Sequence, residues 1–222
     1  MILDLGLLDY EKAYLAQRKL VASRKLQEVG DSLILAEHNP IFTIGRAGSM
    51  KNLLVNEELL KTRGIKVLRI DRGGDITFHG PGQVVCYPII DLKTMGYNLH
   101  KYMRSLESIG IGFFGSYNIK CARVEGMTGV WFDDKKVASI GISATNWITF
   151  HGMSLNVNTD LDFFSMINPC GMSNVRMASL DRLLGMKVSV NDAKARMTKL
   201  FCEKFNITGG DIAGIECKAA LA

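Results

Sequence analysis

Two residues combine a reactive side chain with a sequence position that could activate it. Cys170 stands between Pro169 and Gly171, and because the proline fixes its own φ while the glycine frees the following backbone, the cysteine occupies a tight loop. Lys136 lies in a predicted strand, on a face otherwise occupied by apolar residues, namely Ala138, Ile140 and Ile142. A thiolate is the nucleophilic form of cysteine, and a neighbouring ammonium favours it. If the fold joins them, these residues predict nucleophilic catalysis, with the desolvated lysine as a general acid or base.

Simpler interpretations of both residues remain open at this point. A cysteine framed by proline and glycine can be a buried loop residue, and a lysine on a strand can be structural. The other cysteines lack such a frame; they are Cys86, Cys121, Cys202 and Cys217. Five widely spread cysteines without a Cys-x-x-Cys pair indicate reduced thiols in a cytoplasmic protein. The four scattered histidines form no His-x-x-x-His pair, so we predict no metal site and no cofactor.

The densest group of unusual residues runs from Arg72 to Tyr87. Gly73 and Gly74 allow a positive φ and a close approach of the backbone to a ligand. Pro81-Gly82 fits the central pair of a type II turn, and residues 84–90 read as a buried strand. Polar side chains on loops beside a stiff apolar strand are a common layout of a binding site. The alternative is a glycine-rich connection whose polar side chains bond to their own backbone.

The remaining segments must supply the scaffold that positions these groups. We predict helices at residues 9–24, 56–62, 99–109 and 179–184, and after a cap at Asn191. We predict strands at residues 32–37, 41–44, 65–70, 84–90 and 117–121, and a short helix or turn at 161–166. Two hairpins are expected, one joining 129–132 to 135–142 and one joining 147–150 to 152–157 through a turn at His151-Gly152. The alternation favours an α/β fold: a single domain over residues 1–222, with a mixed sheet flanked by helices.

Composition narrows the class of partner. The chain has 222 residues, 47% of them hydrophobic and 22% charged, which is typical of a globular protein with a substantial core. The net charge of +5 is too small to indicate nucleic acid and is compatible with an acidic protein partner. The amino-terminal residues do not resemble a signal peptide, and no apolar run approaches the length of about 20 residues that spans a bilayer. We therefore expect a cytoplasmic protein that binds no nucleic acid and no membrane.

The pattern Arg-Gly-Gly-x-x-Thr-Phe-His-x-x-Gly-Gln-x-Val-x-Tyr at residues 72–87 resembles the signature of the octanoyltransferases of lipoate biosynthesis, the LipB family. Further segments resemble the same family in the same order; they are residues 37–46, 136–141, 151–156 and 169–171. One departure is Ala178-Ser179-Leu180, where the family pattern has Thr-Ser-Leu. The resemblance implies a fold like that of the biotin and lipoate protein ligases.

The resemblance also implies a reaction and a site. Cys170 would carry the acyl group as a thioester, and Lys136 would lower the pKa of its thiol. The implied acyl pocket consists of Arg72, Gly73, Gly74, Asp75, Ile76, Thr77, Phe78, His79, Ser139, Ile140, Gly141, Gly152, Met153 and Ser154. The implied donor is octanoyl-acyl carrier protein. The implied acceptors are lysine amines on lipoyl domains of 2-oxoacid dehydrogenases and on the glycine cleavage H protein, in the first step of protein lipoylation.

Three alternative functions are distinguishable. An ATP-dependent lipoate-protein ligase shares the fold by resemblance, but an adenylating enzyme needs no nucleophilic thiol, so the Pro-Cys-Gly run favours the transferase. A thiol hydrolase would use His79 or His151 as a base and water as the acceptor. A binding module of the lipoyl or biotin type would need no chemistry at Cys170.

Overall fold

The architecture is built around one large mixed sheet. The computed structural model describes residues 1–171 and 175–207, except for the side chains of Glu57 and Cys170. Within these residues the sheet has eight strands. In spatial order they are β1 (Ile2–Leu8), β2 (Ser32–His38), β6 (Gln83–Ile89), β10 (Ile148–Asn156), β9 (Lys135–Thr145), β8 (Met127–Phe132) and β7 (Ala122–Val124), with β11 (Arg176–Met177) beside β9. The pairs β1–β2 and β9–β11 are parallel and the others antiparallel.

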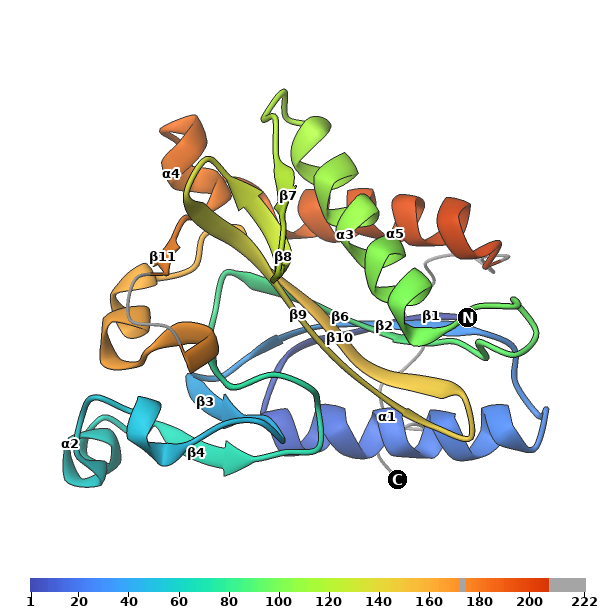
Figure 1. Ribbon diagram of the computed structural model, residues 1–222, viewed down its shortest axis with the longest axis horizontal. Helices are drawn as coiled ribbons and strands as arrows, with labels where there is room; N and C mark the ends of the chain where they lie inside the picture. Colours follow the sequence, from blue (N-terminus) through green and yellow to red (C-terminus); the bar gives the residue numbers. More distant parts are fainter. Residues whose placement is uncertain (172–174, 208–222) are drawn as a thin grey trace.

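Helices cover both faces of this sheet (Figure 1). On one face lie α3 (Leu99–Gly115) and α5 (Val190–Phe205), and on the other lies α1 (Tyr10–Lys25). Strand β6 shows why its sequence is a continuous apolar run: Val84 and Cys86 pack in the core under α3 and α5, whereas Val85 and Tyr87 pack with α1. Both faces of this central strand are therefore buried against helices.

A second, smaller sheet lies beside the first. It consists of β4 (Lys66–Arg69), β3 (Ile41–Ile44) and β5 (Ile76–His79), with β3 parallel to β4 and antiparallel to β5. Short helical segments surround it: η1 (Met50–Asn52), α2 (Glu57–Thr62), η2 (Leu161–Met166) and η3 (Pro169–Gly171). It has a core of its own, in which Phe42, Phe78 and Phe164 are buried. The helix α4 (Leu180–Leu184) follows β11.

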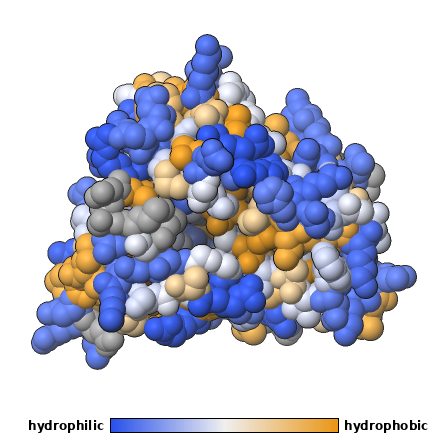
Figure 2. Space-filling model, in the orientation of Figure 1, coloured by the Kyte–Doolittle hydropathy of each residue, from blue (hydrophilic) through white to orange (hydrophobic). Residues whose placement is uncertain are grey.

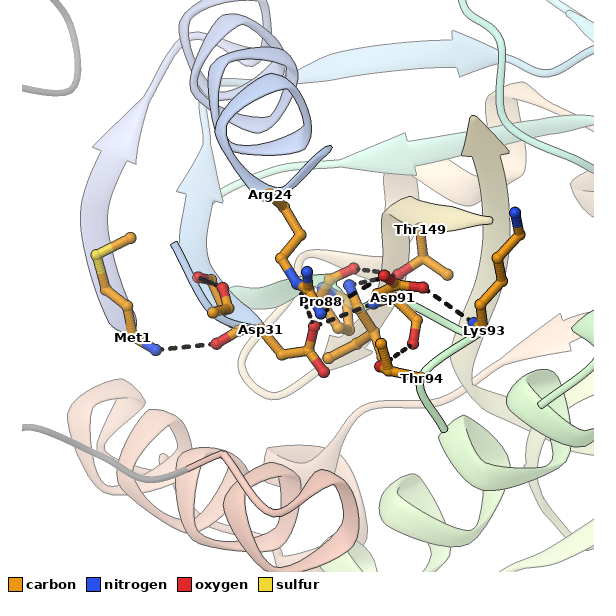
Figure 3. A network of polar contacts seen from close by, with 11 residues as sticks. Met1, Arg24, Asp31, Pro88, Asp91, Lys93, Thr94 and Thr149 are labelled. Atoms are coloured by element: carbon orange, nitrogen blue, oxygen red, sulfur yellow. Dashed lines mark hydrogen bonds and ion pairs between the residues drawn. The ribbon is translucent and has the colours of Figure 1, made fainter. Parts of the chain in front are cut away.

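The carboxyl end of α1 is tied to the loops at one end of the main sheet (Figure 3). Arg24 donates to Asp31 Oδ1 at 2.8 Å, and the same oxygen accepts from the backbone N–H of Asp91 at 3.0 Å. Beside them, Thr149 Oγ1 donates to Pro88 O at 2.8 Å. These bonds connect α1, β6 and β10, three elements that also contribute to the cavity described below.

The surface is mainly hydrophilic on the face that Figure 2 shows, with hydrophobic residues gathered across its middle. Within the described parts of the chain, no helix combines the length and the apolar character needed to cross a bilayer.

Most predicted elements are confirmed, but the strand predicted at 117–121 is wrong. Helix α3 is longer than predicted and continues to Gly115, where the chain turns. Asn118 has a φ of 60°, and Ile119 N bonds back to Phe114 O at 3.1 Å, so the segment ends the helix. The buried Ile119 produced the apolar pattern that resembled a strand.

The second predicted hairpin is also wrong, because residues 148–156 form one continuous strand. Its turn lies earlier, at Asn146 and Trp147, which have φ values of 53° and 69° and form a two-residue hairpin between β9 and β10. His151, whose φ is 56°, and Gly152 lie inside β10 and do not form a turn. They pair with Ile142 and Gly141 of β9. Gly152 is required there for space, since a Cβ at this position would lie 2.1 Å from Cys86 O.

The strand β1 was not predicted from the sequence. Buried and exposed residues do not alternate regularly along this strand. It lies at the edge of the sheet, and its pairing with β2 has a register shift between Asp4 and Leu7. Elsewhere the turn prediction at Pro81-Gly82 is confirmed. Gly82 has a φ of 78°, and Gln83 N donates to Gly80 O at 3.2 Å.

Candidate active site

The glycine loop between β4 and β5 is held between the two sheets. Arg72 is buried, and its Nη2 donates to the carbonyl and hydroxyl oxygens of Thr43 at 2.7 and 3.0 Å. Gly73 N donates to Ile142 O at 2.8 Å, which fixes the loop to β9. The Arg72 side chain crosses Gly141 so closely that a Cβ there would lie 2.9 Å from Arg72 Cδ. The loop is therefore a rigid bridge, with its arginine turned inward.

A narrow cavity opens between the two sheets beside this loop. Its wall consists of Tyr10, Arg72, Gly74, Asp75, Ile76, Thr77, His79, Val85, Tyr87, Lys136, Ser139, Ile140, Gly141, His151, Gly152, Met153 and Ser154. Two of the predicted pocket residues are placed elsewhere. Gly73 lines an adjoining cavity, and Phe78 packs in the core of the small sheet, stacked on Phe163 at 4.4 Å between ring centres. The other twelve predicted pocket residues line this one cavity.

Lys136 is buried in the wall of the cavity, with 3% of its surface exposed. Its Nζ lies 5.4 Å from the centre of the Trp131 ring. The side chain passes over Gly129, whose φ is 137° and where a Cβ would lie 2.5 Å from Lys136 Cε. The prediction that this lysine is core-facing is confirmed, and Gly129 provides the space for it.

The backbone of Cys170 lies in the single turn η3, between Pro169 and Gly171. Its side chain lies outside the described part of the structure, so the predicted thiol–amine pair remains a prediction. The turn itself is anchored, since Asn168 N donates to Asn52 O at 2.8 Å and Gly171 N donates to Asn168 O at 3.0 Å. Gly171 faces the glycine loop so closely that a Cβ there would lie 2.7 Å from Asp75 Oδ2.

The turn and the lysine meet at the wall of a second cavity, of about 580 Å³. Lys136 and Gly171 both line it, together with Gly74 and Asp75 of the glycine loop. The chain that follows the turn returns as β11 and pairs with β9, where Met177 is the register partner of Lys136. The described residues therefore bring the Pro-Cys-Gly turn, the buried lysine and the glycine loop to one place.

Ala178, the departure from the family pattern, lies beside this junction. Its N–H donates to Lys136 O at 3.0 Å, and its carbonyl accepts from Asn156 Nδ2 at 3.1 Å. Both bonds use the main chain, so an alanine satisfies them as well as a threonine would.

Another part of the wall of the narrow cavity is polar and aromatic. Tyr10, Tyr87, His79 and His151 line it, and His38 lies behind them within 2.6 Å of the Tyr87 hydroxyl. Burial lowers the pKa of His79 to about 3. Burial likewise lowers the pKa values of His38 and His151 to about 4. These rings are therefore neutral at pH 7, and each holds one proton on one nitrogen.

The neutral state fixes the direction of the hydrogen bonds. His151 Nε2 lies 2.7 Å from Asp71 Oδ1, which can only accept, so this nitrogen carries the proton. His151 Nδ1 then accepts from the Tyr10 hydroxyl at 3.2 Å. Burial raises the pKa of Asp71, but hydrogen bonds from His151 and Tyr14 outweigh that effect and lower it. Asp71 is the anionic end of a chain of hydrogen bonds.

Several residues of this site were not predicted to belong to it. Tyr10 falls within the helix predicted at residues 9–24, where its spacing indicates only a core residue, and the sequence around Asn52 carries no signal of a site. Tyr87 closed the sequence pattern at residues 72–87, which was the available signal for it. Tyr10 lies more than sixty residues before that pattern, so only the packing of α1 on the sheet reveals its place.

Comparison with known proteins defines the class. Residues 9–202 match the lipoyl protein ligase A/B catalytic domain, which places the chain in that family. The chain is 42% identical over 198 residues to an octanoyltransferase of Pelobacter propionicus, covering 89% of this chain and 91% of that protein. It is also 42% identical over 200 residues to an octanoyltransferase of Geotalea uraniireducens, covering 90% of each. Within the family, the chain belongs to the octanoyltransferases.

Solved structures show the same fold at low sequence identity. Lipoate-protein ligase A bound with ATP superposes with a TM-score of 0.74 at 16% identity, covering 92% of this chain and 85% of that one. A biotin protein ligase from Aquifex aeolicus in complex with biotin and ATP has a TM-score of 0.58 at 14% identity, covering 92% and 70%. The predicted likeness to the biotin and lipoate protein ligases is therefore confirmed for the fold.

Proposed function

We propose that this octanoyltransferase takes an octanoyl group from octanoyl-acyl carrier protein onto Cys170 and passes it to a lysine amine of a lipoyl domain. The observation that carries the proposal is that Lys136 and Gly171 line one cavity together with the glycine loop. The acceptors are the lipoyl domains of 2-oxoacid dehydrogenases and the glycine cleavage H protein, in the cytoplasm. Both kinds of partner are acidic in this family, which agrees with the net charge of +5.

The first half-reaction is an exchange of thioesters. The Cys170 thiolate attacks the thioester carbonyl of the donor, and the thiol of the carrier protein leaves as its carbon–sulfur bond breaks. One thioester replaces another, so the step is nearly balanced in free energy and no ATP is needed. The buried ammonium of Lys136 favours the thiolate and can supply the proton that the leaving thiolate takes.

The second half-reaction forms the product. The neutral acceptor amine attacks the acyl-enzyme, the new carbon–nitrogen bond forms, and Cys170 leaves as a thiolate. The proton lost by the amine goes to Lys136 if that residue is then neutral, which resets the pair. Backbone N–H groups of the glycine segments are the proposed donors to the oxyanion of each tetrahedral intermediate. Conversion of a thioester to an amide is strongly downhill, which drives the transfer.

Mass spectrometry tests the proposal directly. After mixing with octanoyl-acyl carrier protein, the protein should carry one octanoyl adduct on Cys170, and adding an apo lipoyl domain should move it to the acceptor lysine. An adduct on Cys86, Cys121, Cys202 or Cys217 would reject the assignment of the nucleophile. Octanoate-dependent exchange of ATP with pyrophosphate would indicate a ligase. Release of free octanoate with no modified lipoyl domain would indicate a hydrolase.

The role of Lys136 has a separate test. Replacing it with alanine should raise the pH at which iodoacetamide alkylates Cys170, because the thiolate loses its neighbouring positive charge. The matched control is Lys135→Ala, which removes the half-buried side chain of the adjacent lysine on the same strand and should leave the alkylation profile unchanged. Equal alkylation profiles in the parent and in Lys136→Ala would remove Lys136 from the proposed pair.

A further inference from the structure

The side chain of Tyr10 separates two hollows in the protein. It is buried, with 3% of its surface exposed, and lines the narrow cavity between the sheets. It also lines a groove of about 630 Å³ between α1 and β4. The groove is lined by Tyr10, Glu11, Tyr14, Leu15, Arg46, Leu68, Arg69, Ile70 and Asp71. Within the described part of the chain, Tyr10 is the residue common to both walls.

The rest of this partition is a short chain of hydrogen bonds. His151 faces the inner cavity and Asp71 the outer groove, and they are joined at 2.7 Å. Tyr10 donates to His151 from one side, and Tyr14 donates to Asp71 at 3.2 Å from the other. Tyr14 also stacks on His151, with ring centres 5.6 Å apart and an angle of 18° between the planes. The wall is therefore thin, and its side chains are fixed.

This wall lies at the end of the cavity that is remote from the chemistry. On β9, Ala138 is two residues beyond Lys136 and pairs with Leu155 of β10, while Ile142 pairs with His151. The four residues from Leu155 back to His151 cover about 13 Å of strand. An acyl group attached at the Cys170 turn would enter beside Lys136 and point its methyl end towards Tyr10. The cavity thus has a reactive end and a closed end.

We propose that Tyr10 sets the upper limit on the length of the acyl chain, an inference that rests on the proposed octanoyl transfer. A longer chain would have to displace the tyrosine ring and break its buried hydrogen bond to His151. A displaced Tyr10 hydroxyl would be left in the interior without a partner, and that cost exceeds the gain from burying one more methylene. Removing the ring joins the two hollows, and Leu15, Leu68 and Ile70 of the groove can then cover the additional methylenes.

The experiment compares acyl-carrier proteins loaded with octanoyl, dodecanoyl and hexadecanoyl groups. Intact-mass spectrometry measures the initial rate of acyl-enzyme formation with each donor. Tyr10→Ala should raise the dodecanoyl-to-octanoyl rate ratio by at least about tenfold, since changing the depth of an apolar pocket alters discrimination by that order. Tyr10→Phe keeps the ring but loses the hydrogen bond to His151 that opposes its displacement, so its ratio should rise, by less than that of Tyr10→Ala. Tyr10→Leu, which fills part of the space, should also give a ratio between those of the parent and Tyr10→Ala.

A ratio of rates is independent of the fraction of folded enzyme, so a loss of stability does not imitate the effect. Tyr97→Ala is the control, because Tyr97 stacks on Lys101 away from this cavity and its loss should leave the ratio unchanged. If the parent forms an octanoyl adduct while Tyr10→Ala and Tyr10→Leu both keep the parent's ratio, the inference about Tyr10 is overturned. If the parent forms no adduct with any donor, the proposed function itself fails.

Discussion

Asn52 donates a hydrogen bond of 2.7 Å to the Asp75 carboxylate, and this bond joins the glycine loop to the segment that holds the Cys170 turn. The other oxygen of Asp75 accepts from Ser49 N at 3.2 Å and from Ile76 N at 2.7 Å. Asn52 also accepts from Asn168 N through its carbonyl, two residues before Cys170. One asparagine thus contacts both halves of the site.

Replacing Asn52 with alanine should slow acylation of Cys170. The turn would keep its main-chain bond to Asn52 O but lose the tie to Asp75, and a small misplacement of a reacting group costs about 10- to 100-fold in rate. Rapid-quench measurement of acyl-enzyme formation checks this.

Asn56→Ala is the control, because Asn56 caps α2 by accepting from Leu59 N at 2.9 Å. It should cost about 1 kcal/mol of stability as a lost cap, while the rate of acylation stays at the parent's value. Equal rates in the Asn52→Ala variant and the parent would show that the tie does not position the turn.

Gly129→Ala should inactivate the enzyme by moving the lysine. The added Cβ would lie 2.5 Å from Lys136 Cε and 2.7 Å from Ala138 O, at a φ of 137° that alanine rarely adopts. The shifted amine should raise the pH at which Cys170 is alkylated and reduce turnover by about 100-fold.

Gly96→Ala is matched to this change. Gly96 lies in a turn away from the site at a φ of 61°, and a Cβ there would meet nothing within 4 Å. This control should lower the free energy of unfolding, because alanine disfavours a positive φ, but it should not change the pH at which Cys170 is alkylated. If both variants altered that profile equally, backbone strain rather than displacement of Lys136 would be the cause.

Gly152→Ala should destabilise the sheet strongly. The Cβ would lie 2.1 Å from Cys86 O and 2.6 Å from Pro88 Cδ, so β6 and β10 would have to separate. We expect a loss of about 3 kcal/mol in the free energy of unfolding, at the upper end for overpacking. Urea denaturation measures it, with Gly115→Ala at the end of α3 as the control, since a Cβ there meets nothing within 4 Å. A loss no larger than the control's would contradict the packing argument.

Acid should destabilise the protein below about pH 6.5. His38, His79 and His151 bind a proton near the ordinary pKa of 6.5 when unfolded, but burial lowers their folded pKa values to about 4, 3 and 4. Between these values the unfolded chain holds more protons, so stability falls as the pH falls. Each proton contributes about 1.4 kcal/mol per pH unit.

Urea midpoints between pH 7 and pH 4.5 measure this slope, in a range where about three histidines titrate. His38→Gln should reduce the slope, because the replacement cannot titrate, whatever its own effect on stability at pH 7. Exposed His100 supplies the control, and His100→Gln should leave the slope unchanged. A slope in His38→Gln equal to the parent's would mean that His38 is already protonated in the fold.

The sequence predicted the elements whose signal is local. The helix from Tyr10, the strand from Gln83 and the type II turn at Gly82 follow from periodicity, an apolar run and a Pro-Gly pair. The glycine at 152 misled the prediction, because its reason is the carbonyl of Cys86, a contact 66 residues away. Local pattern cannot distinguish a glycine that turns the chain from one that lets two strands approach.

The same division holds for the site. The burial of Lys136 could be predicted because a lysine on an otherwise apolar face is an unusual pattern that is visible within one strand. Asn52 and Tyr10 carry no local oddity, since each becomes part of the site only when two sheets and a helix are packed together. Sequence patterns thus indicate candidate reactive groups better than the residues that hold or enclose them.

Lys136 is held by its main chain on both sides, with Trp131 and Met177 as its register partners and Ala178 N bonded to its carbonyl. The position of this part of β9 therefore does not depend on the Lys136 amine. Under the proposed mechanism, truncation of this side chain therefore leaves an amine-shaped cavity in an otherwise intact site. Small alkylamines added from solution should then restore part of the activity that the truncated variant loses.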